Sequence, residues 1–580
     1  MRPKQGEVAA SPSRSAGSKH SFTSNLDSPG TCQRFPISPW KRFGSLDILR
    51  PERESIPKGL HHSAHTQGRS CLATLGSVIS SFQDGGPNRS VTIGSLPGLF
   101  ILGLSLVLST NSGLAQWSPV APGLDYQEFL QPGPVHVYVV RADRGTNAWT
   151  IDTMKGQGTM KGGHETVPNM AARYDDSITF DGHRYAVKVA INGDYYTGAG
   201  VPLQGQIMAG WLAKRFEDNG GISGFVWPGD RHSFFGGNVQ NGPALQSVAF
   251  ADRAKMQINQ FNTPREPDAL ALYTWQFAPD TGTKADGVEV LVRMNGPLGV
   301  SSPAKGEIVK VRPNTGASPL PFNHVVLSAH GKAAAELLRH ARPGQAVTFQ
   351  LDLKDQGSPH IGLGPHDWSG AYASLGAPKN ILVKGTVTRE WEAKARKYAE
   401  QGKKHGSVVQ DPRTAIALND RYLFFLVIDG RSKESIGMTF TETGFFCRDV
   451  LKATDAALQD GGGSSTLWIN GKVKNIPSGK GKDEKYGLLR AVCNGYFIAE
   501  LLPPKKSTGF QAGQKVRAKG ELRLGPGTTF GSAGKVNETD TGTVLPEPLN
   551  GIFAKGDYWW LCRFGDAEGW AAAGQLAHIQ

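Results

Sequence analysis

Cysteine is scarce in this sequence, and the cysteines present are not spaced as metal ligands. Only five occur among 580 residues, and no two of them form a CxxC pair. Structural zinc sites usually take ligands from such closely spaced pairs, so we do not expect a zinc-stabilised fold. Of the three cysteines beyond residue 115, Cys447 and Cys493 could form a disulfide, and buried free thiols are an equal alternative.

A dense cluster of positive charge is also missing. The formal net charge is +13, but residues 1–115 hold twelve Lys and Arg against six Asp and Glu, which is nearly half of the excess. The rest of the chain has no stripe of Lys and Arg with interleaved aromatic residues, so we expect no nucleic-acid partner. With 39% hydrophobic residues, the composition is otherwise that of an ordinary globular protein.

The main apolar run is too short to span a membrane. Residues 96–108 are apolar over about a dozen positions, whereas a helical bilayer span needs ~20. Small residues follow the run and end at Ala115, which is typical of a secretory signal peptide cleaved after that residue. We interpret residues 91–115 as this signal peptide, although an uncleaved anchor is the alternative, and residues 1–90 as a non-native or disordered extension. The mature protein is then secreted or periplasmic, within the cell envelope, and has no transmembrane span.

From residue 134 onward, the sequence is typical of β-strands separated by Gly, Asn and Asp turns. Runs of β-branched and aromatic residues predict strands at 136–140, 185–190 and 422–428. A mostly β insertion is predicted over residues 246–355.

Helical patterns are fewer. Thr439 and Glu442 form a capping-box pattern that predicts a helix continuing through Leu451, and a second helix is predicted over residues 332–341. Because strands and helices do not alternate regularly, we predict an α+β fold with a mixed sheet rather than a doubly wound sheet. This domain is expected to cover residues 116–502.

The most distinctive local motif is the glycine-rich turn at residues 460–466, which we place between a helix and a strand. Its three successive glycines let the backbone approach a ligand closely, and their N–H groups could bind an anion beside the Ser464 and Ser465 hydroxyls. No Gly-Lys-Ser/Thr follows, so the turn is not a nucleotide P-loop. Taken alone, a tight structural turn would be the commoner explanation.

Polar residues also gather at the ends of predicted strands. Asn192-Gly193-Asp194 follows one strand, Arg413 begins another, and Asp429-Gly430-Arg431 ends a third. Functional sites gather at strand ends in sheet-based folds. Each of these residues alone could equally be a solvated turn residue or a surface charge.

Taken together, these segments resemble the phosphodiester glycosidase family in both content and order. The family has an NG-D-aromatic turn, an RTA strand start, a DGR element, a DGGGSS-T signature and a late Arg-x-x-x-Asn element. The matching residues are 192–195, 413–415, 429–431, 460–466 and 490–494.

The resemblance covers roughly residues 134–502, and it departs from the family pattern at three places. Gln459 stands where the family usually has an apolar residue, Leu489 replaces a common Glu, and residues 375–378 match a Gly-Gly-x-Pro element only in part. The departures put the substrate in doubt more than the class of reaction.

The resemblance implies an exported hydrolase that cleaves sugar-1-phosphodiesters at the glycosidic C1–O bond, in envelope polysaccharides or glycolipids. It would release a free sugar and a phosphomonoester. Asp460 is the first catalytic candidate, with Asp429 or Asp194 as its partner, since the oxocarbenium-like transition state needs a nearby carboxylate. Arginines would pair with the phosphate oxygens. The predicted substrate-binding residues are Asn192, Gly193, Arg413, Arg431, Gly461, Gly462, Gly463, Ser464, Ser465, Arg490 and Asn494.

This scheme requires no cofactor, although the three carboxylates are hard oxygen ligands and could bind a divalent cation. The alternative function is that of a non-catalytic polysaccharide-binding or exopolysaccharide and envelope-assembly protein, which Gln459 and Leu489 favour. A peptidoglycan hydrolase has little support, because no Cys/His or zinc-ligand pattern occurs with the expected spacing.

After a polar linker at residues 503–508, residues 509–580 resemble a bacterial SH3-type domain, a small β-barrel. The matching segments are 522–527, 558–563 and 568–570. Such domains often bind cell-wall peptides, so the resemblance implies a peptidoglycan contact. The equal alternative is that the tryptophans of these segments only pack the interior of the module.

Overall fold

The computed structural model describes residues 116–216, 223–376, 379–480 and 485–579. The predicted extension and signal peptide, residues 1–90 and 91–115, therefore lie outside the described residues. Within the described ranges, no helix has both the length and the apolar character needed to cross a membrane.

The chain is mostly β, so the predicted α+β class holds only in part. Among the described strand pairs, β13 (Gln260–Phe261) and β14 (Leu270–Thr274) form the one parallel pair, and the others are antiparallel. The helices are few and short. They are α1 (Val167–Tyr174), α2 (Gly331–His340), α3 (Glu392–Glu400) and α4 (Phe440–Phe445).

Both helix predictions are confirmed. Helix α2 falls within one residue of the predicted segment 332–341, and α4 begins after a complete capping box. The Glu442 amide donates to Thr439 Oγ1 at 3.1 Å, and the Thr439 amide donates to Glu442 Oε2 at 2.7 Å. Two amides at the start of the helix are thereby satisfied. Helix α4 then continues as a π-helical turn, Phe446–Val450.

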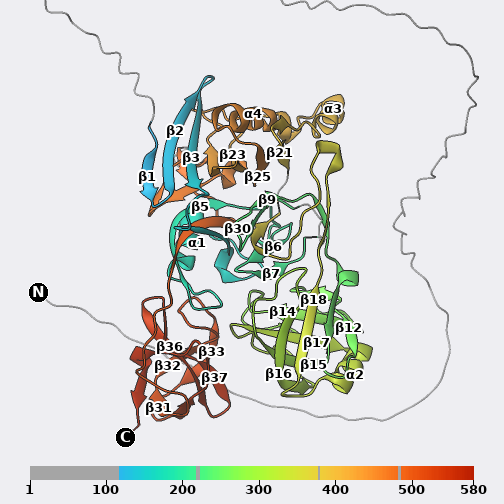
Figure 1. Ribbon diagram of the computed structural model, residues 1–580, viewed down its shortest axis with the longest axis vertical. Helices are drawn as coiled ribbons and strands as arrows, with labels where there is room; N and C mark the ends of the chain where they lie inside the picture. Colours follow the sequence, from blue (N-terminus) through green and yellow to red (C-terminus); the bar gives the residue numbers. More distant parts are fainter. Residues whose placement is uncertain (1–115, 217–222, 377–378, 481–484, 580) are drawn as a thin grey trace, which may run out of the picture. The chain divides into compact units, whose positions relative to one another are not determined.

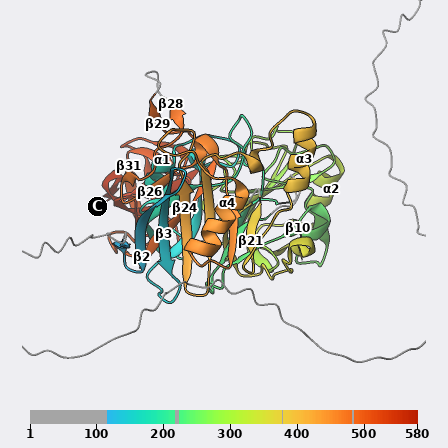
Figure 2. The same ribbon diagram turned by 90° about the horizontal axis from the view of Figure 1, so that it is seen from above.

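An eight-stranded sheet carries three of the sequence motifs. Its order is β1-β2-β3-β24-β23-β25-β21-β22. Buried side chains of α4 and of the following turn pack on one face, as Figures 1 and 2 show for the ribbon. The strands are β1 (Ser118–Ala121), β2 (Leu124–Gln131), β3 (Val135–Asp143), β21 (Asn380–Val383), β22 (Thr386–Val387), β23 (Arg413–Leu418), β24 (Tyr422–Ile428) and β25 (Asp455–Leu458).

A second sheet, of order β27-β26-β5-β30-β4, carries the other motifs. Apolar side chains from both sheets share one core that includes Val140, Phe425, Ile191 and Ile498, so the two sheets pack face to face. Helix α1 covers the opposite face of the second sheet. The strands are β4 (Thr150–Lys155), β5 (Arg184–Asn192), β26 (Leu467–Ile469), β27 (Lys472–Val473) and β30 (Asn494–Leu502).

Between residues 206 and 375, the chain builds two further sheets. The larger has the order β12-β11-β18-β16-β15-β17-β14-β13, with Leu337 of α2 in its core, and it falls within the segment predicted to be a β insertion. Its remaining strands are β11 (Gln246–Ala249), β12 (Lys255–Gln257), β15 (Gly287–Met294), β16 (Ala304–Pro313), β17 (His324–His330) and β18 (Ala346–Leu351). The smaller sheet consists of β6 (Gln206–Met208), β7 (Trp211–Lys214), β8 (Phe225–Pro228), β9 (Phe234–Phe235) and β20 (Ala371–Leu375). Short pairs join β10 (Asn238–Gln240) to β19 (Lys354–Gly357), and β28 (Gly479–Lys480) to β29 (Tyr486–Leu488).

The C-terminal strands form one small sheet around a core of their own. Trp559, Trp560 and Trp570 are all buried, so these tryptophans contribute to packing. The strands are β31 (Lys515–Ala518), β32 (Gly520–Arg523), β33 (Ser532–Val536), β34 (Thr541–Val544), β35 (Ile552–Ala554), β36 (Asp557–Phe564), β37 (Ala567–Ala572) and β38 (Leu576–His578).

The cysteines Cys447, Cys493 and Cys562 are all buried free thiols. The disulfide considered for Cys447 and Cys493 is therefore not formed, and the alternative of buried thiols holds. Burial raises the pKa of each of them, which makes these thiols unreactive.

Candidate active site

Three of the motifs meet at one edge of the first sheet. Strand β23 lies antiparallel between β24 and β25, so its start lies beside the ends of both: Arg413 pairs with Ile428 of β24, and Ala415 pairs with Leu458 of β25. The Gln459 amide donates to Thr414 O at 2.8 Å, and the Gly462 amide donates to Pro412 O at 2.9 Å. These bonds hold the glycine-rich turn against the start of β23. The turn follows strand β25 rather than the helix expected from the sequence.

Asn192 joins this edge to the second sheet. It is the last residue of β5, and its side chain is 0% exposed. Its Nδ2 donates to Asp460 O at 2.6 Å, while its Oδ1 accepts from Thr414 Oγ1 at 2.8 Å and from the Thr466 amide at 3.1 Å. The predicted contact of Asn192 with sugar hydroxyls stays a prediction, and the observed bonds give this amide a positioning role.

Asn494, the first residue of β30, also has a positioning role. Its Oδ1 accepts from the Asp194 amide at 2.8 Å, and its Nδ2 donates to Gln206 Oε1 at 3.3 Å. A Cβ at Gly193 would lie 2.6 Å from Asn494 Oδ1, so only glycine fits there. These contacts place the Asp194 side chain in the same buried region as Asp460.

The Asp460 and Asp194 carboxyls are both buried, with residue exposures of 8% and 1%. Burial raises the pKa of Asp460 to about 6, opposed by the nearby Ser464 hydroxyl, the Gly461 amide, and the charges of Arg490 and Arg431. Burial also raises the pKa of Asp194 to about 8, opposed chiefly by the Gln204 amide, and the Asp460 charge adds to the increase. Near neutral pH, Asp460 is therefore mostly ionised while Asp194 holds its proton.

The Asp429 carboxylate differs from those of Asp194 and Asp460 in its hydrogen-bond partners. Its Oδ1 accepts from Asn475 Nδ2 at 3.1 Å, and its Oδ2 accepts from the Ile476 amide at 2.9 Å. Asn475 Nδ2 also donates to Ser465 O at 3.1 Å, so Asp429 supports the end of the glycine-rich turn. By contrast, Asp194 Oδ1 is buried without a hydrogen-bond partner among the described residues. Asp194 is thus the better placed partner for Asp460.

The three predicted phosphate-binding arginines differ in the partners that the protein already gives their guanidinium groups. Arg413 donates to the carbonyls of Met438, Gly406 and Val409, so most of its guanidinium is committed to the fold. Arg431 pairs with both carboxylate oxygens of Asp411, at 2.6 and 2.9 Å.

Of these three arginines, Arg490 has the guanidinium group that is available to bind a ligand. It is exposed, and within the described ranges it has neither a hydrogen bond nor an ion pair. A Cβ at Gly463 would lie 2.4 Å from Arg490 Nη2, and one at Gly462 would lie 2.7 Å from Arg431 Nη2. The missing side chains of these glycines make room for the two guanidinium groups beside Asp460.

Several buried polar groups of the site lack partners. The hydroxyls of Ser464 and Ser465, and both polar atoms of the Gln459 amide, make no hydrogen bond of ordinary geometry with the described residues. Nearly all buried polar groups in proteins have a hydrogen-bond partner. We therefore expect these atoms to form hydrogen bonds with a ligand or with water.

Sequence reasoning did not assign roles to Tyr196 and Gln204. Tyr196 contacts the site, since burial raises its pKa and the Asp460 charge adds to that shift, and its hydroxyl donates to Ala491 O at 3.2 Å. The Gln204 amide donates to Asp194 Oδ2 at 2.5 Å. The tandem aromatic residues after Asp194 were a signal for Tyr196, whereas no sequence pattern indicates Gln204.

No group of three or more His, Cys, Asp or Glu side chains suited to a metal occurs in the described part of the chain. Asp194, Asp429 and Asp460 are therefore not grouped as a set of three metal ligands.

The model of one protein family, described as phosphodiester glycosidase, matches residues 299–499. The match contains Arg413, Asp429, Asp460 and Arg490, and it does not reach Asn192. It indicates a phosphodiester glycosidase domain in this part of the chain, the class that the sequence resemblance predicted.

Solved structures similar to this chain include the catalytic domain of zebrafish N-acetylglucosamine-1-phosphodiester alpha-N-acetylglucosaminidase, auto-inhibited by its pro-peptide. It is 13% identical, with a TM-score of 0.32, and the match covers 67% of this chain and 84% of that one. A hypothetical protein from Synechocystis is 15% identical, with a TM-score of 0.44 and coverage of 67% and 64%. A Burkholderia pseudomallei protein described as exported is 20% identical, with a TM-score of 0.42 and coverage of 64% and 74%. The chain thus spans under two thirds of the Synechocystis protein. No curated protein matches.

Proposed function

We propose that this protein is a hydrolase that cleaves sugar-1-phosphodiesters at the glycosidic C1–O bond, releasing a free sugar and a phosphomonoester. The observation that carries the proposal is the grouping of two buried carboxyl groups, and an arginine without an ion pair among the described residues, at a glycine-rich turn. These groups are Asp460, Asp194 and Arg490.

The chemistry follows from the charges of these groups. Arg490, together with the hydroxyls of Ser464 and Ser465, supplies donors for the phosphate oxygens. The Asp460 carboxylate stabilises positive charge that develops at C1 of the sugar, and it either attacks C1 or activates a water. Asp194 carries the proton that a leaving oxygen can receive.

The role of Arg490 predicts a difference between two substrates that share the same sugar. UDP-N-acetylglucosamine has phosphate on C1, whereas p-nitrophenyl N-acetyl-alpha-glucosaminide does not. We expect Arg490→Met to raise KM for the first substrate about 10- to 100-fold, the loss of one or two charge-assisted hydrogen bonds. The KM for the second substrate should change little.

Release of the free sugar, measured with both substrates, checks this prediction. Arg448→Met is the matched control, since Arg448 is an exposed arginine paired with Asp449. An equal effect of Arg490→Met on both substrates would contradict a phosphate contact. Binding of both substrates without release of sugar would favour the alternative, a non-catalytic polysaccharide-binding or envelope-assembly protein.

The two carboxyl groups predict a bell-shaped pH dependence of kcat/KM. Activity should fall below about pH 6 because Asp460 becomes protonated, and above about pH 8 because Asp194 loses its proton. In Asp194→Asn the remaining activity should no longer decline on the alkaline side. A pH profile of both proteins tests this, and an alkaline limb that persists in Asp194→Asn would assign it to another group.

We further propose that the substrate is an envelope polysaccharide or glycolipid and that the protein acts outside the cytoplasm. The support is the signal-peptide pattern at residues 91–115 and the resemblance of residues 509–580 to an SH3-type domain. Such a domain would hold the enzyme at peptidoglycan.

A further inference from the structure

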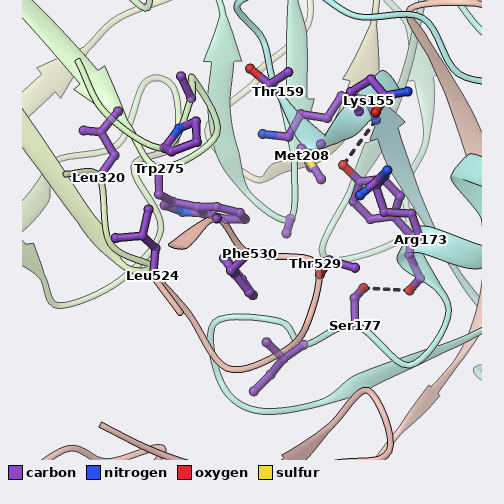
Figure 3. A pocket seen from close by; sticks show the side chains of 18 of the residues that line it. Lys155, Thr159, Arg173, Ser177, Met208, Trp275, Leu320, Leu524, Thr529 and Phe530 are labelled. Carbon is purple, nitrogen blue, oxygen red and sulfur yellow. Dashed lines mark hydrogen bonds between the residues drawn. The ribbon is translucent and has the colours of Figure 1, made fainter. Parts of the chain in front are cut away.

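A second cavity of about 490 Å³ lies among β4, α1, the β insertion and the C-terminal strands. Its size is within the range of about 300–1,000 Å³ that is usual for sites of small ligands. None of the predicted catalytic or substrate-binding residues lines it. Figure 3 shows Lys155, Met208, Trp275 and Phe530 among its lining side chains.

The cavity holds a buried lysine amine that has no anionic partner among the described residues. Lys155 is 2% exposed, and its Nζ donates to the carbonyl oxygen of Gln276 and lies 5.5 Å from the centre of the Trp275 ring. Within the described ranges, no carboxylate forms an ion pair with it. Burial, and after it the charge of Arg173, holds the pKa of Lys155 well below its usual value.

Three other charged groups of the cavity are already satisfied by the protein, while Lys161 is exposed at its rim. Arg173 pairs with both oxygens of Glu165 at 2.9 Å, and Lys555 donates to the carbonyls of Ala172 and Asp175. Asp152 accepts from the Tyr185 hydroxyl at 2.6 Å and from the amides of Ala209 and Thr153. Lys155 is the buried amine of the cavity without an ion pair, and an acid group placed beside it would stabilise its protonated form.

The wall near Lys155 is apolar and aromatic. Trp275 and Phe530 lie 5.8 Å apart, centre to centre, and Leu320, Leu524 and Met208 add further apolar surface. The indole Nε1 of Trp275 is buried and has no acceptor among the described residues. An apolar body can therefore be buried here while an attached acid group reaches the ammonium.

We propose that this cavity binds a small amphipathic organic acid, with its carboxylate on Lys155 and its apolar body against Trp275 and Phe530. This inference does not depend on the proposed hydrolase activity, because it uses none of the same residues.

Calorimetric titration of the purified protein with decanoate, decanol and acetate tests the proposal. Decanol has the apolar body without the acid group, and acetate has the acid group with almost no body. We expect decanoate to bind at one site and at least about tenfold more tightly than either of the others, because only decanoate satisfies both parts of the cavity. Lys155→Met should weaken decanoate about tenfold and leave decanol unchanged.

Lys332→Met, on the exposed surface of α2, is the control and should bind decanoate normally. If Lys155→Met does not fold, trinitrobenzenesulfonate labelling of Lys155 in the unaltered protein, followed by peptide mass mapping, replaces it. Decanoate should slow that labelling, and decanol should not. Absence of saturable decanoate binding, equal binding by Lys155→Met, or labelling unaffected by decanoate would each overturn the proposal.

Discussion

Asp460→Asn should lower kcat for UDP-N-acetylglucosamine on the order of 1,000-fold, because the neutral amide cannot stabilise the positive charge that develops at C1. The substitution keeps the shape of the side chain. Asp460 also holds its place through its backbone, since its amide donates to Gly193 O and its carbonyl accepts from Asn192. The variant is therefore expected to fold normally and to retain substrate binding.

Turnover and substrate Kd, measured side by side, distinguish a chemical role from a structural one. Asp449→Asn is the control, since this aspartate is exposed and paired with Arg448. Turnover of Asp460→Asn within about threefold of the unaltered protein would remove Asp460 from the reaction. Loss of both turnover and binding would instead point to a disturbed glycine-rich turn.

Asn192→Ala should give the largest loss of stability, about 3 kcal/mol in the free energy of unfolding. Truncation leaves Asp460 O, Thr414 Oγ1 and the Thr466 amide without their partner. Each buried group left unsatisfied costs about 1–3 kcal/mol, and the effects are not fully additive.

Urea unfolding of the variant and of Asn537→Ala measures this difference. Asn537 is an exposed asparagine in the turn between β33 and β34. We expect the control to unfold like the unaltered protein. A change below about 1 kcal/mol for Asn192→Ala would mean that the three contacts are replaceable by water.

Local patterns in the sequence were sufficient to predict the parts of the fold that depend on neighbouring residues. The capping box of Thr439 and Glu442 and the apolar spacing of α2 involve residues within a few positions of each other, and both helices are present. Helices proved too few for the α+β class, because most of the polar segments between motifs form strands of separate sheets.

The roles of the individual site residues could not be predicted from local sequence patterns. Asp194 and Asp429 were equal candidates at the level of sequence, and only their partners separate them. Asn475 and Ile476 donate to the two oxygens of Asp429, while Asp194 Oδ1 has no partner in the part of the chain that the structure describes. Arg413 and Arg490 were likewise both candidates for binding phosphate. The structure separates them, because Arg413 donates its hydrogen bonds to three backbone carbonyls. Such roles depend on contacts between segments that are far apart in the chain.

The bond from Asn192 to Asp460 links residues 268 positions apart, with the whole β insertion between them. The segment that matches the glycosidase family, residues 299–499, begins after Asn192 and Asp194. The proposed site is therefore discontinuous in the chain, and trimming the protein to the matching segment would remove both residues. Closing so long a loop is a slow event in folding, so the site should be among the last features of the molecule to form.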